Sequence, residues 1–254
     1  MSLIRESVLR MKGYTPGEQP ADPGIVKLNT NENPYPPSPA VGDALRRLDP
    51  AALGRYPDPV CRRLRKRIAS MHGLTPERIF VGNGSDEVLA LCVRAFVRRP
   101  GGTVGSFEPS YSLYPVLAAI EDVPWEASPL GPEYEWQPPR NAPGVFFLTH
   151  PNAPTGMVYP RERIEEFCRA FPGVVVVDEA YVDFADAHLM DLIHTHPNVL
   201  VARTLSKSYS LAGLRVGYLA GAEDLIAALY KIKDSYNVDR LAQEIAYVAL
   251  GDGG

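Results

Sequence analysis

The sequence predicts an α/β fold in which a mostly parallel, doubly wound sheet carries helices on both of its faces. Residues 174–177 are consecutive valines that end in Asp178, and so short a β-branched run is typical of a strand buried on both sides. A second apolar run, residues 199–202, leads toward Lys207. Strand-loop-helix patterns recur from residue 80 to residue 234, which favours a parallel sheet. Ligands of such sheets bind at the carboxyl ends of the strands, so Asp178 and Lys207 are expected to share a site.

The composition excludes several classes of protein. The chain has 254 residues, 45% hydrophobic and 22% charged, and a net charge of −4 argues against a nucleic-acid partner. No apolar run approaches the ~20 residues of a membrane helix, so no membrane partner is expected. Cys61, Cys92 and Cys168 are far apart, which argues against a zinc site or a disulfide framework and favours the cytoplasm.

The order of elements predicts three parts of the chain. Residues 1–40 are expected to form an extended arm, because residues 29–37 contain three prolines. Residues 41–240 are expected to form the large domain, with helices in two pieces over residues 38–72, a helix capped by Ser85 and another over residues 222–234. Residues 121–143 suggest a hairpin or an irregular excursion. Residues 241–254 are expected to begin a second, smaller domain that the chain does not complete.

The predicted carboxyl edge of the sheet collects polar and aromatic side chains that suit pyridoxal 5'-phosphate. This cofactor needs a lysine for its aldehyde, a carboxylate for its ring nitrogen and an aromatic ring against its face. It also needs a phosphate site made of a helix N-terminus, hydroxyls and an arginine. The candidates are Gly84, Ser85, Tyr111, Asn152, Asp178, Tyr181, Ser206, Lys207 and Arg215.

Two other nucleotide-binding classes fit the sequence poorly. An apolar strand that ends in Asp-Glu also occurs in NTPases, but the glycines at residues 82 and 84 are not followed by the Lys-Ser or Lys-Thr of a phosphate loop. A Rossmann dehydrogenase requires G-x-G-x-x-G in its first strand-helix unit, and this pattern is absent. His150, between a strand and a proline, favours a structural role.

Six motifs spread over nearly the whole chain resemble those of the fold-type I aminotransferases, and most closely the histidinol-phosphate aminotransferase group. They are residues 29–34 (NTNENP), 55–57 (RYP), 82–87 (GNGSDE), 151–156 (PNAPTG), 178–181 (DEAY) and 204–215 (TLSKSYSLAGLR).

The resemblance implies a role for each matching residue. Lys207 is similar to the lysine that bonds the cofactor, Asp178 to the partner of its ring nitrogen, and Tyr111 to the stacked ring. Asn152 and Tyr181 resemble the pair that bonds the 3-oxygen of the ring. The implied catalytic residues are Lys207, Asp178 and Tyr181. The phosphate site is implied to comprise Gly84, Ser85, Asp86, Thr204, Ser206 and Arg215, with Tyr56 from the neighbouring subunit. Tyr14, Asn33 and Asn152 are implied to contact substrate.

The resemblance further implies a cytoplasmic homodimer of histidine biosynthesis that converts histidinol phosphate and 2-oxoglutarate to imidazole acetol phosphate and glutamate. Threonine-phosphate decarboxylation or aromatic transamination on the same scaffold stays open. The family continues into a small domain whose arginines grip the substrate, and this chain ends before it. An inactive cofactor-binding fragment is therefore the remaining alternative, and poor cofactor binding by the chain alone is expected.

Overall fold

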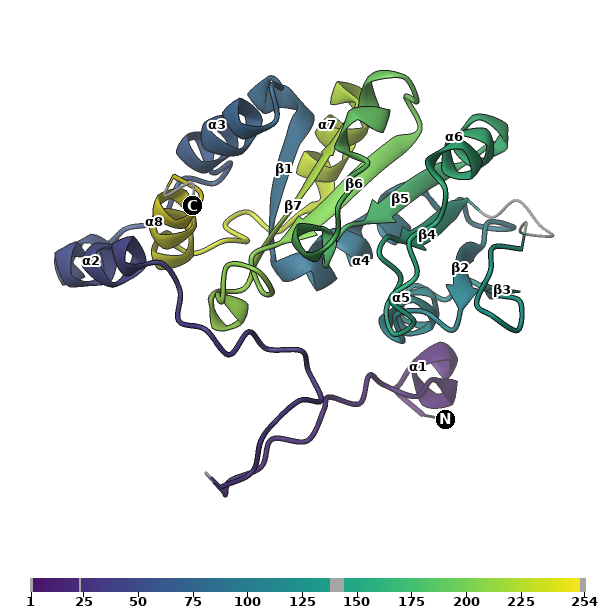
Figure 1. Ribbon diagram of the computed structural model, residues 1–254, viewed down its shortest axis with the longest axis horizontal. Helices are drawn as coiled ribbons and strands as arrows, with labels where there is room; N and C mark the ends of the chain where they lie inside the picture. Colours follow the sequence, from purple (N-terminus) through teal and green to yellow (C-terminus); the bar gives the residue numbers. More distant parts are fainter. Residues whose placement is uncertain (1, 23, 138–143, 252–254) are drawn as a thin grey trace.

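The computed structural model describes residues 2–22, 24–137 and 144–251 and contains one sheet flanked by helices (Figure 1). Within these residues seven strands pair in the order β1-β7-β6-β5-β4-β2-β3. The strands are β1 (Ile79–Asn83), β2 (Val104–Glu108), β3 (Trp125–Pro129), β4 (Val145–Thr149), β5 (Val174–Asp178), β6 (Val199–Thr204) and β7 (Val216–Gly221). This arrangement confirms the predicted α/β class.

The sheet is parallel apart from β7, which runs antiparallel to both of its neighbours. Consecutive parallel strands need a crossover, usually through a helix, whereas antiparallel strands accept a short link. Only a loop and one short 3-10 turn (Ala212–Leu214) join β6 to β7, so the chain turns back immediately after Lys207. The same geometry keeps Lys207 at the edge where the parallel strands end.

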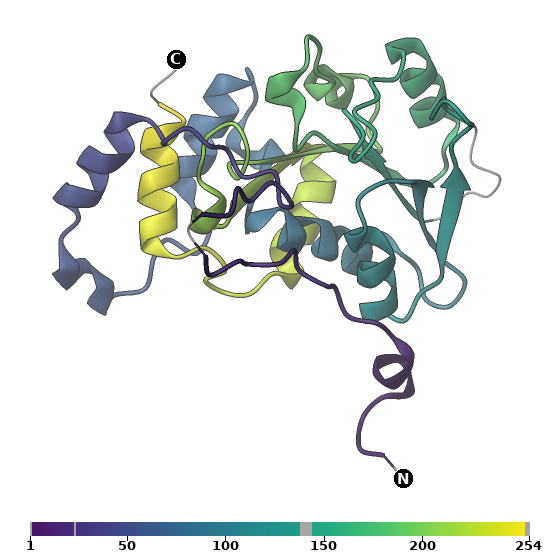
Figure 2. The ribbon, with the colours of Figure 1, turned by 60° about the horizontal axis from the view of Figure 1, so that its bottom comes forward.

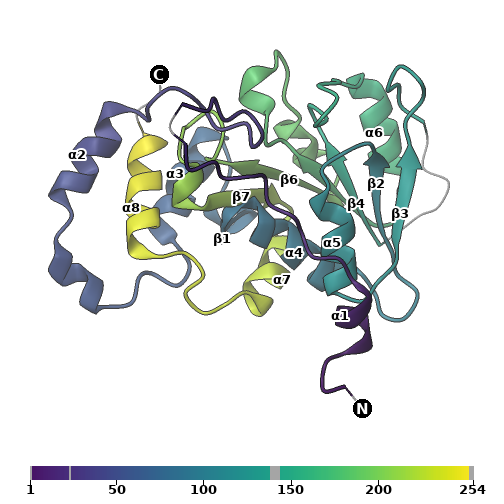
Figure 3. The same cartoon turned by 90° about the horizontal axis from the view of Figure 1, so that it is seen from below.

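Alternate residues of the strands face two separate apolar cores, as expected for strands buried on both sides. Val176 of β5 packs with α4 (Gly84–Phe96), α5 (Leu113–Ile120) and α7 (Glu223–Ile232). Val175 and Val177 face the opposite core, which includes residues of α3 (Arg62–Met71), α6 (Arg161–Ala170) and α8 (Arg240–Ala249). Figure 3 shows α4, α5 and α7 together on one side of the sheet.

The N-terminal arm crosses the carboxyl edge of the sheet rather than joining it (Figure 2). It begins with α1 (Glu6–Arg10), continues without regular structure and ends at α2 (Pro39–Arg47). The remaining elements are short 3-10 turns: Pro50–Gly54, Pro76–Arg78, Val182–Phe184 and Met190–His194. The predicted two-piece helical region over residues 38–72 therefore appears as α2 and α3.

Two local expectations were wrong. The part of residues 121–143 that the structure describes contains no hairpin; β3 pairs in parallel with β2 as the outermost strand, and residues 138–143 lie outside the described part. Ser85 does not cap α4, because the helix already begins at Gly84, with Asn83 in the cap position. A glycine at φ +80° lets the turn close one residue early.

The described part of residues 241–254 lies in α8, which packs against α2 and α3. Ala242, Ile245, Ala246 and Ala249 of this helix are buried in the core shared with α3. The division into an arm, a large domain and the start of a smaller domain stays a proposal. Among the described residues, no helix combines the length and apolar character that a bilayer crossing requires.

Candidate functional site

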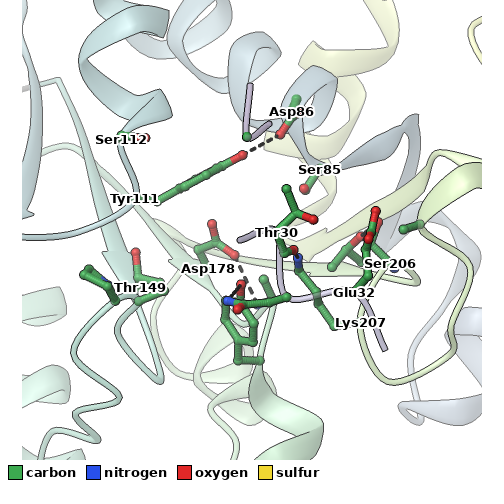
Figure 4. A pocket seen from close by; sticks show the side chains of 18 of the residues that line it. Thr30, Glu32, Ser85, Asp86, Tyr111, Ser112, Thr149, Asp178, Ser206 and Lys207 are labelled. Carbon is green, nitrogen blue, oxygen red and sulfur yellow. Dashed lines mark hydrogen bonds between the residues drawn. The ribbon is translucent and has the colours of Figure 1, made fainter. Parts of the chain in front are cut away.

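The main candidate is a cavity of about 540 Å³ at the carboxyl edge of the sheet, with the N-terminal arm forming one wall (Figure 4). Its size is within the range of small-molecule sites. The predicted residues that line it are Tyr14, Ser85, Asp86, Tyr111, Asp178, Tyr181, Thr204, Ser206, Lys207 and Arg215. Side chains from the arm, α4, four strand ends and the loop after β6 therefore meet in one place.

Asp178 is the buried acid of this cavity. It ends β5 with 3% of its surface exposed. Its Oδ2 accepts a hydrogen bond from the Tyr114 hydroxyl at 2.9 Å, and its Oδ1 accepts one from the Ala180 amide at 3.1 Å. Burial raises the pKa of Asp178 to about 6, although these two bonds oppose the rise, and the charges of Asp86 and Glu179 add to it. A cation or an N–H donor in the cavity would stabilise the ionised form.

Lys207 lies across the cavity on the loop after β6. Its Nζ donates a hydrogen bond to the Thr30 carbonyl oxygen at 2.8 Å and lies 5.4 Å from the centre of the Tyr181 ring. The arm turn that presents Thr30 is braced by Lys27, whose Nζ reaches Glu32 at 2.6 Å and the Thr30 hydroxyl at 2.8 Å. Among the residues that the structure describes, the amine therefore pairs with no acid and contacts only the neutral Thr30 carbonyl and the Tyr181 ring.

The N-terminus of α4 forms a second wall that suits an anion. Asp86 accepts hydrogen bonds from Arg215 at 3.2 Å and from the Tyr111 hydroxyl at 3.3 Å. A Cβ on Gly84 would come within 2.4 Å of the Arg215 guanidinium, so a side chain here would displace the arginine, and the φ of +80° at this position also favours glycine. Free amides at a helix N-terminus, next to an arginine and hydroxyls, form a typical phosphate site.

The hydroxyls of this wall come from a tight turn after β6. The Thr204 Oγ1 accepts a hydrogen bond from the Ser206 amide at 3.1 Å and lies 3.0 Å from the Ser206 Oγ. A Cβ on Gly217 of β7 would lie 2.6 Å from the Ser85 amide nitrogen. Close packing of α4 on β7 thus brings Ser85 beside this turn.

Tyr111 provides the aromatic surface of the cavity. Its ring packs edge-on against Tyr114 with centroids 5.6 Å apart, while its hydroxyl points toward Asp86 (Figure 4). Burial is the main cause that raises the pKa of Tyr111 above its usual value, so the hydroxyl stays a donor.

Asn152 is buried beside the cavity rather than in its lining. Its amide nitrogen donates to the Pro109 carbonyl at 3.0 Å and to Thr155 at 2.9 Å, and its oxygen accepts from Ser110 at 2.8 Å. Together with Tyr181 it lines an adjoining cavity of about 520 Å³. The predicted pair is thus brought together, but the Asn152 amide hydrogens point at the protein.

Three further predicted residues, besides Asn152, lie outside the main lining. Tyr56 is 77% exposed and stacks on Tyr236 of its own chain, with centroids 4.4 Å apart. Asn33 donates from its side chain to the Lys207 and Ser208 carbonyls, both at 3.2 Å, and so fastens the arm instead of facing the cavity. Gly84 does not line the cavity, but its lack of a side chain leaves room for the Arg215 guanidinium. His150 is buried, with one ring nitrogen 3.4 Å from the Tyr159 carbonyl.

The sequence reasoning missed Tyr114, Thr149, Ser110 and Thr30. Thr149 ends β4 in register with Asp178, so the rule that sites lie at strand ends could have found it. Tyr114 lies one helical turn after Tyr111, a weaker signal. Thr30 had no signal, because only the folded arm brings its carbonyl to Lys207. Among the described residues, no cluster of His, Cys, Asp and Glu side chains could hold a metal ion.

Comparison with known proteins gives a consistent assignment. Residues 23–253 match the aminotransferase class I and II family. Histidinol-phosphate aminotransferase of Geotalea uraniireducens (strain Rf4) is 47% identical over 98% of this chain, and the chain spans 72% of that relative. The enzyme of that name from Rippkaea orientalis is 41% identical over 97% of this chain and 71% of its own.

A solved structure also has this fold. The crystal structure of histidinol-phosphate aminotransferase from Sinorhizobium meliloti in complex with pyridoxal-5'-phosphate superposes with a TM-score of 0.81 at 29% identity. The alignment covers 88% of this chain and 63% of that chain, which is less than two thirds of the crystallised protein.

Proposed function

Because the chain belongs to the aminotransferase class I and II family, we propose that it is a pyridoxal-phosphate-dependent aminotransferase that acts on histidinol phosphate and 2-oxoglutarate. The products would be imidazole acetol phosphate and glutamate, in histidine biosynthesis. The observation that carries the proposal is the single cavity shared by buried Asp178, Lys207 and the anion site at α4.

The residues present fit pyridoxal phosphate by their chemistry. The phosphate would be held by the α4 amides, Ser85, the turn hydroxyls and Arg215, which the missing side chain of Gly84 admits. Asp178 offers a buried acceptor suited to a ring N–H, and Tyr111 a flat surface for the ring face. When bound, the cofactor supplies an electron sink for the pair of electrons left when the substrate loses its Cα proton.

The chain's own residues would position and move that proton. Lys207 would hold the cofactor covalently until the substrate's amino group displaces it. Its free Nζ would then take the proton from the substrate Cα and donate it to the cofactor carbon that had carried the lysine. For this step its Nζ must leave the Thr30 carbonyl, which now holds it. Asp178 would hold the ring proton, and Tyr181 with Asn152 would bind the 3-oxygen of the ring. The arm would exclude water above Lys207.

We also propose a homodimer with shared sites and a cytoplasmic location. Tyr56 is 77% exposed and lies outside the lining of its own cavity, and Arg240 donates a hydrogen bond to its carbonyl oxygen at 2.9 Å. A neighbouring subunit could receive the Tyr56 hydroxyl at its phosphate site. All three cysteines are buried free thiols, as is usual in a reducing compartment.

The test is a half-reaction. The chain is loaded with pyridoxal phosphate, freed of excess cofactor and mixed with histidinol phosphate alone. Loss of the visible absorbance of bound cofactor with stoichiometric imidazole acetol phosphate supports the proposal. Phosphothreonine and phenylalanine are tested as alternative amino donors. A faster reaction with either would identify that compound, and not histidinol phosphate, as the substrate.

A further inference from the structure

A continuous row of hydrogen bonds runs beneath the cavity from Asp178 to Asn152. The Tyr114 hydroxyl lies 2.9 Å from the Asp178 Oδ2 and 2.6 Å from the Thr149 Oγ1. The Thr149 Oγ1 lies 3.0 Å from the Ser110 Oγ, which lies 2.8 Å from the Asn152 Oδ1. Tyr114, Thr149, Asn152 and Asp178 are all buried. The two ends of the row are the residues proposed for the nitrogen and the 3-oxygen of the cofactor ring.

The number of protons in this row does not match the number of links when Asp178 is ionised. Four oxygen-to-oxygen links join the two ends, but the three hydroxyls carry one proton each. The carboxylate and the amide oxygen at the ends only accept. One link therefore lacks a proton, unless Asp178 itself is protonated and donates to Tyr114.

The alternative is to turn the Asn152 amide over, so that its nitrogen donates to Ser110. The present orientation is held by two donations from Nδ2, to the Pro109 carbonyl at 3.0 Å and to the Thr155 hydroxyl at 2.9 Å. Turning the amide would set its oxygen against the Pro109 carbonyl, which only accepts. The row thus has a proton for every link in two states: a protonated Asp178 with the present amide, or an ionised Asp178 with the amide reversed, which gives up the bond to the Pro109 carbonyl.

We propose that Tyr114, Thr149 and Ser110 are positioning residues that couple the protonation of Asp178 to the orientation of the Asn152 amide. In the cofactor-free chain, at a pH below the pKa of Asp178, this residue holds a proton while the Asn152 oxygen faces Ser110. A cofactor whose ring N–H requires an ionised Asp178 then drives the amide to turn, so both ring partners change state together. The effect of the cofactor on the amide rests on the proposed function, whereas the proton count rests on the hydrogen bonds of the chain alone.

The surroundings of Asp178 agree with a stored proton. Its pKa is raised to about 6, chiefly by burial, with the charges of Asp86 on α4 and Glu179 next along the chain contributing to the rise. Tyr111 faces it across the cavity as a neutral phenol. The cations of the cavity are otherwise engaged, since Lys207 donates to the arm and Arg215 pairs with Asp86.

The experiment measures the titration of Asp178 in the cofactor-free 254-residue chain by NMR of ¹³C-carboxyl-labelled aspartate, assigned through Asp178→Asn. Thr149→Val and Ser110→Ala each remove one hydroxyl and the two oxygen-to-oxygen links that it makes. In both variants two hydroxyl protons remain for two links, so every link has a proton even when Asp178 is ionised. Both substitutions should lower the pKa of Asp178 by about one unit, although the Asp178 carboxyl is hydrogen-bonded to Tyr114 and Ala180 and not to Thr149 or Ser110. Tyr114→Phe removes the donor to Asp178 and should raise its pKa instead.

Ser112→Ala is the matched control, because this exposed serine lines the same cavity two residues from Ser110 and is not a member of the row; Asp178 should titrate in it as in the wild type. The wild-type Asn152 side-chain amide signals should move with the midpoint of Asp178. If Thr149→Val and Ser110→Ala titrate like wild type, or Tyr114→Phe lowers the pKa, the coupling does not exist. Cofactor binding is measured separately, so its failure would overturn the proposed function and leave this result standing.

Discussion

The Nζ of Lys207 donates a 2.8 Å hydrogen bond to the carbonyl oxygen of Thr30, a residue 177 positions earlier in the chain. Asn33 adds two bonds from the arm to the Lys207 and Ser208 carbonyls. The segment around Thr30 therefore covers the amine that the proposed reaction requires. Lys207 lines the cavity, but its Nζ can bond a cofactor only after it leaves the Thr30 carbonyl.

Loosening the arm should be measurable without any reaction. Asn33→Ala removes both side-chain bonds to the loop after β6, and a hydrogen bond of this kind contributes about 1 kcal/mol. The arm should then open roughly five- to thirty-fold more often, and limited proteolysis within residues 24–38 should accelerate accordingly. Asn29→Ala is the control, because the Asn29 side chain donates its hydrogen bond to the Glu18 carbonyl, within the arm itself. Equal cleavage rates for Asn33→Ala and wild type would show that these bonds do not fasten the arm.

Lys207 should be the residue that carries the cofactor. Borohydride reduction of the loaded chain followed by peptide mapping should find the pyridoxyl label on Lys207, and Lys207→Ala should abolish the label. Lys231→Ala is the control, since this lysine lies in the last turn of α7, away from the cavity lining. A label on Lys231 or Lys233 would assign the site elsewhere.

Asp178→Asn should retain cofactor and lose most of the rate. A neutral amide cannot hold the ring proton against the electron flow of the reaction. The loss of one such electrostatic contact is worth roughly 10²–10³-fold, measured as the single-turnover rate with histidinol phosphate. Asp186→Asn, an exposed acid beside the adjoining cavity, is expected to react at the wild-type rate. A wild-type rate for Asp178→Asn would exclude Asp178 as the nitrogen partner.

The same substitution should stabilise the cofactor-free chain above neutral pH. The pKa of Asp178 rises from 3.8 in the unfolded chain to about 6 in the fold, so the folded state retains a proton that the unfolded state releases. Stability therefore falls as pH rises from 3.8 to about 6 and stays lower above that range. Asp178→Asn removes this cost, which amounts to about 3 kcal/mol at pH 7.5.

Urea unfolding at several pH values measures that difference. His72 contributes the opposite slope, because burial lowers its pKa from 6.5 to about 4, and stability is lost as pH falls through this range. His72 is present in both proteins, so the difference between wild type and Asp178→Asn isolates Asp178. A difference that shrinks toward neutral pH would contradict the assigned direction.

The shared-site proposal predicts complementation between two defective subunits. Tyr56→Phe lacks the hydroxyl offered to the neighbour, and Lys207→Ala lacks the amine. A heterodimer of the two would contain one site with both groups and one with neither, so mixing should restore wild-type cofactor affinity at half of the heterodimer's sites. Tyr134→Phe, an exposed tyrosine outside the cavity lining, is the matched control. Equal cofactor affinity of Tyr56→Phe and wild type at every protein concentration would argue against a shared site.

The sequence by itself determined the sheet and the residues at its carboxyl edge. Short β-branched runs such as residues 174–177 predict strands that are buried on both faces. The polar residue that ends each parallel strand then lies at the carboxyl edge of the sheet. Asp178, Lys207 and Arg215 were therefore found from spacing and motif alone. The family resemblance named their roles, and the match over residues 23–253 supports the assignment to the family.

The tertiary structure alone decided which of these groups contact one another. Periodicity does not encode contacts between distant segments, so the Thr30 carbonyl on Lys207, the stacking of Tyr56 on Tyr236 and the hydroxyl row under the cavity were not foreseen. The reversal of β7 depended on a loop too short for a crossover, which local patterns did not reveal. Strand identity is a property of a few neighbouring residues, whereas these contacts exist only once the arm, α4 and α5 have packed around the sheet.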